Sequence, residues 1–240
     1  QGMKLFPRRW LADFGRRKAV GQTPPVPDVW HWLRQAGGIA TIVDIGAHTG
    51  EFAQFLADYF RPERFLALEP LPECLPALKA RTKTIRNFEV LPFAAGLKTG
   101  LATIHKNPYP PASSLLPLTE ISRKEFPQTD GLEVNIPVEV RSLDSLIRAA
   151  DLPRNILVKI DVQGMEDQVL RGGRELFAAT HMVLVEMCFA AFYESQPLFE
   201  EIHEILVQIG FRHGGMRNQI LSPRTGQPLF CHAIYIRARA

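Results

Sequence analysis

Short apolar runs alternate with amphipathic stretches along this chain, and the alternation predicts an α/β fold with a mostly parallel sheet. Four runs, at 40–45, 64–68, 156–160 and 182–185, are almost continuously apolar, as expected for strands that are buried on both faces. An acidic residue stands within or just after each run. With 240 residues, of which 46% are hydrophobic and 22% charged, the chain can form one such domain with helices on both faces of the sheet.

The elements of the first half follow from apolar spacing, capping residues and glycine stops. A proline-rich stretch at 107–117 separates them from the second half and is expected to be an irregular loop. In order, we expect a helix over 28–35 that Asp28 caps, the strand 40–45, a helix over 50–59 with Phe52, Phe55 and Leu56 on one face, the strand 64–68, a helix over 73–82, a strand near 88–93 and an extended segment at 101–105.

The second half shows the same two kinds of pattern. Apolar and polar residues alternate at 134–140, which predicts a strand, and Gly210 closes the last helical stretch. In order, we expect the strand 134–140, a helix that Ser142 or Asp144 caps and that runs to Ala150, the strand 156–160, a helix over 164–178, the strand 182–185, a helix over 198–209 and strands near 211–216 and 232–238.

Charge is distributed unevenly. Residues 1–18 hold six basic residues and one acid, so the net charge of +3 for the whole chain leaves −2 for the remainder. We therefore predict a basic N-terminal arm at 1–23, a stiff linker with three prolines at 24–27, and a single domain over 24–240. A helix packed on its own domain, or a frayed arm, is the favoured interpretation of 1–18, and peripheral contact with an anionic membrane is the alternative.

The composition also bears on partners and location. The slightly acidic body argues against a nucleic-acid-binding face. No transmembrane segment is expected, because no run approaches the roughly 20 apolar residues that span a bilayer. The three cysteines form no C-x-x-C pair, and residues 1–18 lack the long apolar stretch of a secretory signal. These features predict a cytoplasmic protein.

A glycine turn follows the first apolar strand. Asp44, Gly46, His48 and Gly50 alternate with other residues between this strand and the next helix, and Glu69 ends the second strand 25 positions after Asp44. The glycines let the backbone approach a ligand, and Glu69 is placed to accept hydrogen bonds from ribose hydroxyls. This arrangement predicts a nucleoside-cofactor site, with an unliganded strand-turn-helix corner as the alternative.

The spacing of the glycines distinguishes between cofactors. An NAD-binding turn reads G-x-G-x-x-G and presents helix N–H groups to a pyrophosphate. Here the carboxylate of Asp44 heads the turn, which disfavours phosphate and suits an ammonium group. S-adenosylmethionine carries an amine and a ribose and no phosphate, so it is the favoured cofactor.

Two further strand-end acids, Asp161 and Glu186, are expected to share one crevice with Asp44 and Glu69, because ligands of open α/β sheets bind outside the carboxyl ends of the strands. Asp161 and Glu186 are the candidate catalytic carboxylates, and together they could also hold Mg²⁺. His48 is a second candidate base, and Lys159 could neutralise Asp161 from the same strand face. For Glu166, a helix-capping role and a functional role are equally compatible with the sequence.

The segment 158–166, V-K-I-D-V-Q-G-M-E, is similar to the FkbM family of S-adenosylmethionine-dependent methyltransferases. Further resemblance lies in 43–50, 69–70, 113–115, 142–144 and 210–211, and it covers roughly 40–236. The resemblance implies a class I methyltransferase fold, which is Rossmann-like with a mostly parallel seven-stranded sheet, and O-methylation of a hydroxyl group on a sugar, glycan or natural product. It places Asp161 at the methionine end of the cofactor and near the substrate. The full set of expected cofactor contacts is Asp44, Gly46, Ala47, His48, Thr49, Gly50, Glu69, Pro70, Ser114 and Asp161.

Alternatives within the same fold stay open at this stage. The acceptor could instead be an amine, a protein side chain or RNA, or the chain could be a catalytically silent module that binds S-adenosylmethionine. The loop 107–117 is either a lid over the cofactor or an ordinary surface loop. Loops 107–131 and 187–197 are expected to shape the acceptor pocket, while the sequence leaves the acceptor, metal dependence and oligomeric state open.

Overall fold

A seven-stranded sheet forms the centre of the molecule. The computed structural model describes residues 29–35 and 38–238. The strand order is β3-β2-β1-β7-β8-β10-β9, and all the pairings from β3 to β8 are parallel, whereas β10 runs antiparallel to both of its neighbours. The strands are β1 (Thr41–Ile45), β2 (Arg64–Leu68), β3 (Phe88–Leu91), β7 (Ile156–Ile160), β8 (Thr180–Cys188), β9 (Phe211–Leu221) and β10 (Pro228–Arg237). The predicted fold class is confirmed.

The central strands form because their side chains are almost all apolar and can be buried on both faces. Every residue of β1 and of β7 is buried, which explains the continuous apolar runs in the sequence. Asp44 and Lys159 interrupt these runs, and they are register partners on the adjacent strands β1 and β7. Two opposite charges thus meet inside the core, where each one offsets the cost of burying the other.

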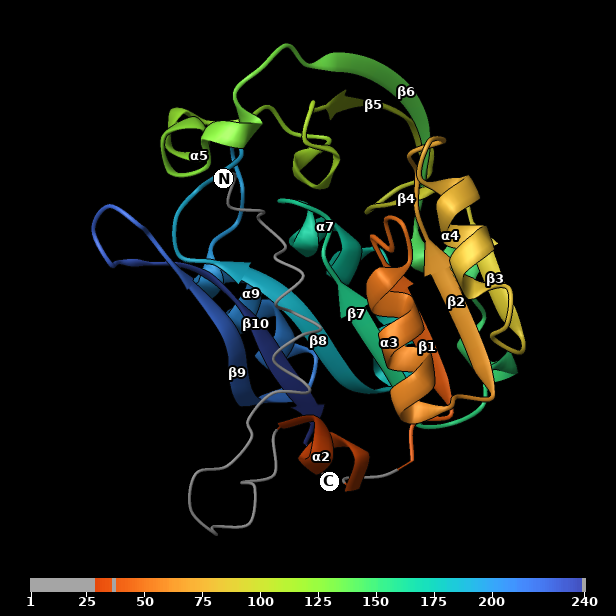
Figure 1. Cartoon of the computed structure of the whole chain (residues 1–240). Helices are drawn as coiled ribbons and strands as arrows, with labels where there is room; N and C mark the ends of the chain where they lie inside the picture. The colour runs from red at the N-terminus through yellow and green to blue at the C-terminus, as the bar shows by residue number, and fades with distance from the viewer. Residues whose placement is uncertain (1–28, 36–37, 239–240) are drawn as a thin grey trace, which may run out of the picture. The chain divides into compact units, whose positions relative to one another are not determined.

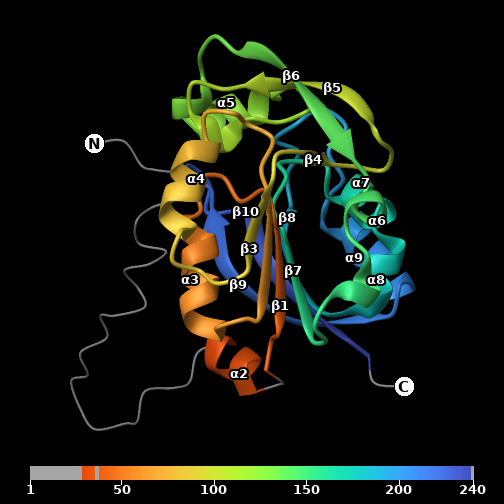
Figure 2. The same ribbon diagram turned by 90° about the vertical axis from the view of Figure 1, so that its right-hand side faces the viewer.

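Helices cover both faces of the sheet (Figure 2). One face carries α3 (Glu51–Phe60) and α4 (Leu75–Thr82), and the other carries α6, α7, α8 and α9. These four are α6 (Leu143–Leu146), α7 (Glu166–Arg171), α8 (Arg174–Ala179) and α9 (Phe199–Gln208). Apolar residues on the α7, α8 and α9 side, among them Leu170, Leu176 and Leu206, join the strands in one buried cluster. The sheet is therefore held rigidly, and the loops at its edge carry the site.

A second, smaller sheet lies over the carboxyl ends of the central strands (Figure 1). Its order is β4-β6-β5, with β4 (Ala94–Ala95), β5 (Gly100–Lys106) and β6 (Val134–Arg141). The helix α5 (Glu120–Glu125) and 3-10 turns at Pro110–Ala112, Pro127–Thr129 and Ala149–Asp151 complete this region and the connection to β7. The strands predicted at 101–105 and 134–140 are thus confirmed. They pair with each other in the smaller sheet and are not part of the central sheet.

The helix predicted over 164–178 is two helices, and glycines cause the break. α7 ends at Arg171 and α8 starts at Arg174. A Cβ on Gly172 would lie 2.0 Å from the carbonyl oxygen of Gly96, so the chain can pass that loop only at a glycine. A contact between segments far apart in the sequence sets this boundary.

The helix predicted from Ser142 or Asp144 to Ala150 is also shorter than expected. α6 ends at Leu146, because Ile147 adopts an extended conformation and is buried. Asp144 does serve as a cap, but for α8: its two carboxylate oxygens each accept a bond of 3.0 Å, from the backbone N–H groups of Glu175 and Leu176. The sequence therefore indicates the capping residue, Asp144, but not the helix that it caps.

The chain divides into two compact units, residues 1–37 and 38–240. In the first unit the structure describes the helix α2 (Val29–Gln35), which agrees with the helix predicted at 28–35. The predicted basic arm at 1–23, the linker at 24–27 and the cap at Asp28 lie outside the described residues. None of the helices that the structure describes has the length and apolar character needed to traverse a bilayer.

Candidate active site

A pocket opens at the carboxyl ends of β1, β2 and β7, below the second sheet. Five of the residues predicted to contact the cofactor line it: Gly46, Glu69, Pro70, Ser114 and Asp161. The remaining wall comes from the turn after β3, from β4 and from the loop after β7, and includes Phe93, Ala94, Ala95, Val162, Gln163 and Met165. The pocket thus has a polar floor made by strand ends and an apolar wall.

The glycine turn lies against the end of β7. Gly46 has a φ of +82°, and a Cβ at this position would lie 1.9 Å from the carbonyl oxygen of Asp161. The backbone N–H groups of Gly46 and Ala47 both donate to the carbonyl oxygen of Leu68, at 3.0 Å each. A side chain at 46 would therefore push β1 and β7 apart at the floor of the pocket.

Glu69 connects the turn to the end of β2. Its carboxylate accepts hydrogen bonds from the backbone N–H of His48 at 2.7 Å and of Leu71 at 2.8 Å, one at each oxygen. Each oxygen keeps a second lone pair, which is available to a ligand in the pocket. Burial raises the pKa of Glu69 to about 7, and the two backbone bonds oppose this rise.

Asp44 does not line the pocket. Its side chain is fully buried below the turn, with Oδ1 3.0 Å from Nζ of Lys159. The same ammonium donates to the carbonyl oxygen of Gly46 at 2.8 Å and lies 3.6 Å from Asp161. Burial alone would lower the pKa of Lys159, but the charges of Asp44 and Asp161 raise it. The geometry thus gives Asp44 a role below the turn, holding Lys159, and does not support the predicted contact with a cofactor amine.

His48, Thr49 and Gly50 stand at the start of α3 and lie outside the lining of the pocket. The Nδ1 atom of His48 lies 3.4 Å from Oγ1 of Thr49, and burial lowers the pKa of His48. No hydrogen bond or ion pair within the described part of the chain joins His48 to Asp161 or Glu186. The structure therefore offers no contact in support of His48 as the catalytic base.

Gln163 joins the two predicted catalytic carboxylates. Asp161 follows β7 and Glu186 lies near the end of β8, the adjacent parallel strand. The side-chain amide of Gln163 donates to Asp161 Oδ1 at 2.6 Å and to Glu186 Oε2 at 2.9 Å. Burial, followed by the charge of Asp161, raises the pKa of Glu186 well above its usual range. The structure brings both acids together, and Asp161 is the one that faces the pocket.

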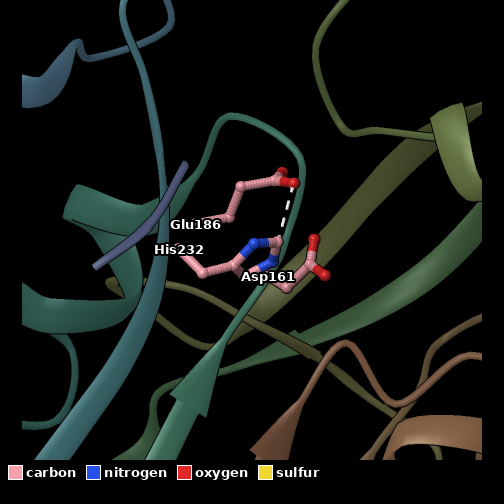
Figure 3. Close-up of side chains that lie close together, drawn as sticks. All are labelled: Asp161, Glu186 and His232. Atoms are coloured by element: carbon pink, nitrogen blue, oxygen red, sulfur yellow. Dashed lines mark ion pairs between the residues drawn. The ribbon is translucent and has the colours of Figure 1, made fainter. Parts of the chain in front are cut away.

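His232 joins these acids from β10 (Figure 3). It is the register partner of Glu186 across the antiparallel pair of β8 and β10, and its Nε2 lies 4.0 Å from Glu186 Oε1. Burial lowers the pKa of His232 to about 4, so the imidazole is neutral near neutral pH. We refer to Asp161, Glu186 and His232 as the acid–histidine cluster. No local sequence pattern indicates His232, because only the pairing of β8 with β10 reveals its partner.

The loop after β7 is tied to the segment above the pocket. Ser114 Oγ donates to the carbonyl oxygen of Gln163 at 2.6 Å, and the Tyr193 hydroxyl lies 2.8 Å from Gln163 Oε1 and 3.2 Å from the carbonyl oxygen of Ala112. Glu166 accepts bonds from the N–H groups of Val162 and Gly164 in the same loop. Glu166 thus holds the loop before α7 in place, while the N-cap of that helix, Met165, makes no side-chain cap bond.

The sequence is similar to those of known methyltransferases. The sequence matches the family model described as "Methyltransferase FkbM domain" over residues 44–213. It is 27% identical over 194 residues to the methyltransferase sdnD of Sordaria araneosa, covering 71% of this chain and 73% of that protein. It is 25% identical over 173 residues to the 2-O-methyltransferase NoeI of Sinorhizobium fredii, covering 69% and 70%. Among solved structures, the N-methyltransferase NodS from Bradyrhizobium japonicum matches 86% of this chain and 90% of that chain, with a TM-score of 0.48 and 11% identity.

Proposed function

The chain belongs to the FkbM family of methyltransferases, and from this premise we propose that it transfers the methyl group of S-adenosylmethionine to a hydroxyl group of a sugar, glycan or other hydroxylated natural product. The observation that carries the proposal is the pocket that has Glu69 and the glycine turn at one end and Asp161 at the other. One end suits a nucleoside and the other suits an acceptor that must lose a proton.

The first end fits the nucleoside of S-adenosylmethionine. Both Glu69 oxygens have one backbone N–H partner and one remaining lone pair, so the carboxylate can accept from two vicinal ribose hydroxyls. The apolar wall at Leu71, Phe93 and Ala94 suits a flat purine ring. Gly46 lets the turn lie directly against the end of β7 at the floor, since a Cβ there would overlap the carbonyl oxygen of Asp161. Among the described residues that line the pocket there is no lysine or arginine to pair with a pyrophosphate, which favours this cofactor over a dinucleotide.

The other end carries the acids. The cofactor, when bound, supplies a methyl group that its sulfonium makes open to displacement by an oxygen nucleophile. A neutral hydroxyl is a weak nucleophile, so a carboxylate that accepts its proton contributes roughly 10²- to 10⁴-fold to such a reaction. Asp161 lines the pocket and shares Gln163 with Glu186, so a proton taken by Asp161 stays within a pair of carboxylates. Ser114 and Gln163 line the pocket from two different segments, and the hydrogen bond between them holds these segments together beside Asp161.

A relative supports a hydroxyl as the acceptor. NoeI is a 2-O-methyltransferase, and the aligned region covers 69% of this chain. We propose the same type of acceptor atom here, an oxygen on a small hydroxylated molecule, and not an amine or RNA.

The test is a transfer assay with methyl-labelled S-adenosylmethionine and a panel of glycosides, polyols, amines and RNA. We expect label to appear as a methyl ether on a hydroxylated acceptor, as identified by NMR. Asp161→Asn should lose this transfer, whereas Asp151→Asn, which changes a surface acid that pairs with Arg148, should keep it. Label that appears on an amine or on RNA would contradict the proposed acceptor. Absence of transfer to every acceptor, despite cofactor binding, would favour a silent binding module.

A further inference from the structure

The acid–histidine cluster combines three metal-ligating side chains from three different strands. Asp161 follows β7, Glu186 lies on β8 and His232 lies on β10, and Figure 3 shows the two carboxylates and the imidazole close together beside the end of β7. One ligand atom from each residue lies within 4.8 Å of those of the other two. Glu186 and His232 lie on strands, which position side chains more precisely than loops do, and Asp161 directly follows one.

The cluster is buried, which makes negative charge on its carboxyl groups costly without a cation. The exposed fractions are 7% for Glu186 and 3% for His232, and the side chain of Asp161 is 12% exposed. Gln163 offers both acids only a neutral amide, which uses Asp161 Oδ1 and Glu186 Oε2. The other oxygen of Glu186, Oε1, faces Nε2 of His232 at 4.0 Å.

Lys159 does not provide the missing charge by itself. Its ammonium lies 3.0 Å from Asp44 and 2.8 Å from the carbonyl oxygen of Gly46, and the distance to Asp161 is longer, 3.6 Å. Lys159 is therefore shared between Asp44 and Asp161 and lies closer to Asp44, so it offsets the charge of Asp161 only in part. Buried charges of this kind are paired with a cation or coordinate a metal ion.

We propose that Asp161, Glu186 and His232 bind a divalent transition-metal ion such as Mn²⁺ or Zn²⁺. The imidazole decides the class of ion, because two carboxylates alone suit Mg²⁺ whereas a histidine nitrogen favours a softer ion. Nε2 of His232 and Oε1 of Glu186 are 4.0 Å apart, which is longer than an edge of a coordination shell with bonds of about 2.1 Å, so these two side chains close around the ion as it binds. Three protein ligands leave coordination positions open to water or to an acceptor oxygen.

The open position gives the ion a function next to the pocket. An acceptor hydroxyl that coordinates the ion has a lower pKa, and its oxygen is fixed beside Asp161. This step rests on the proposed function, whereas binding of the ion to the three side chains does not. The proposed metal site and the proposed function can therefore fail separately.

Manganese binding to the full chain tests the site. We titrate Mn²⁺ and follow the loss of the free-ion signal by electron paramagnetic resonance, with calorimetry for Zn²⁺ and Mg²⁺. The wild type should bind one Mn²⁺, and Zn²⁺ should compete for it more strongly than Mg²⁺. His232→Gln should weaken binding by more than the roughly 10- to 100-fold that loss of an outer-shell partner costs. His181→Gln is the matched control, since His181 is on the same strand as Glu186 but roughly 16 Å away along β8, and it should bind as the wild type does.

Circular dichroism and the affinity for S-adenosylmethionine, measured on the same samples, separate loss of the site from loss of the fold. Glu186→Gln, which preserves volume, provides a second variant in case His232→Gln unfolds. Absence of Mn²⁺ and Zn²⁺ binding in a folded wild type would overturn the metal site, and so would equal binding by wild type and folded His232→Gln. If S-adenosylmethionine binds but no metal does, only the metal proposal fails. If metal binds but S-adenosylmethionine does not, only the proposed function fails.

Discussion

The two ends of the pocket are built in different ways. The glycine-turn end, which consists of residues 46–50 and Glu69, uses two consecutive strands, and its contacts are mostly to main-chain atoms. The acid–histidine cluster uses side chains from three strands, and its members lie 25 and 46 positions apart in the sequence. A cofactor that many enzymes share can be recognised by a backbone shape, whereas chemistry on a particular acceptor depends on side chains. The comparison therefore predicts that substitutions at the two ends have separable effects.

The largest effect is expected at the acid–histidine cluster. Glu186→Gln keeps the shape of the side chain but removes the carboxylate that shares Gln163 with Asp161, so kcat for methyl transfer should fall about 10²-fold, the lower end of the range for general base catalysis. The Kd for S-adenosylmethionine should change less than about 3-fold, because Glu186 is not among the residues that line the pocket. Turnover with labelled cofactor and calorimetry measure the two quantities. A parallel loss of both would show that the two ends are not separable.

Gly46→Ala should disturb both ends of the pocket, because Gly46 belongs to the glycine turn and also contacts the backbone of Asp161. The new Cβ would lie 1.9 Å from the carbonyl oxygen of Asp161, at a φ of +82° that alanine disfavours. We expect the free energy of unfolding to fall by at least about 3 kcal/mol, as measured by urea denaturation. Gly100→Ala is the control, since no atom lies within 4 Å of its added Cβ, and it should stay within about 1 kcal/mol of the wild type. Equal stability of the two variants would contradict the close approach of β1 and β7.

The pH dependence of cofactor binding should belong to the glycine-turn end. The pKa of Glu69 is raised to about 7, and its ionised form is the better acceptor for ribose hydroxyls. The affinity for S-adenosylmethionine should therefore fall up to about 10-fold from pH 8 to pH 6. Glu69→Gln should bind about 10- to 100-fold more weakly at pH 8, with no dependence on pH over this range.

The stability of the free protein should change in the opposite sense. Because the folded-state pKa of Glu69 lies above its ordinary value of 4.5, the carboxyl contributes stability that is present below about pH 4.5 and lost as the pH rises through about 7. Glu69→Gln should therefore gain stability relative to the wild type between pH 6 and pH 8, as measured by urea denaturation. An unchanged difference between the two across this range would show that Glu69 does not titrate there.

The smallest effect is expected from the contacts that close the pocket. Tyr193→Phe removes hydrogen bonds to Gln163 and Ala112, so kcat/KM should fall about 5-fold, which corresponds to about 1 kcal/mol. Tyr235→Phe removes a bond of 2.7 Å to His203, outside the pocket lining, and should lower stability while leaving kcat/KM unchanged. Equal losses of kcat/KM in the two variants would show a general effect of lost stability.

The sequence predicted those parts of the fold that depend on local pattern. The central strands were found because continuous apolar runs mark strands that are buried on both faces, and the glycine turn with Glu69 was found because it spans two consecutive strands. The break between α7 and α8 was missed because the space at Gly172 is limited by Gly96, 76 positions earlier. The pairing of β5 with β6 in a separate sheet depends likewise on tertiary packing.

Strand-end position in the sequence predicts only some of the residues that line the pocket. Glu69 and Asp161 line the pocket as their strand-end positions indicate, whereas Asp44 is below the turn because Lys159 is its register partner on β7. The sequence does not indicate His232, because β10 runs antiparallel to β8. The pairing places His232, from within β10, opposite Glu186 near the carboxyl end of β8. Residues whose placement depends on a distant pairing carry no local signal.

Calorimetric titration of S-adenosylmethionine and of its demethylated product into wild type and Glu69→Ala tests the central claim most directly. Glu63→Ala is the matched control, because Glu63 is exposed and precedes β2 at the opposite end of the same strand. The account predicts micromolar binding to wild type and to Glu63→Ala, and at least a 10-fold loss in Glu69→Ala. Wild-type protein that binds neither compound, or a folded Glu69→Ala that binds as tightly as wild type, would contradict the assignment of this pocket to the cofactor.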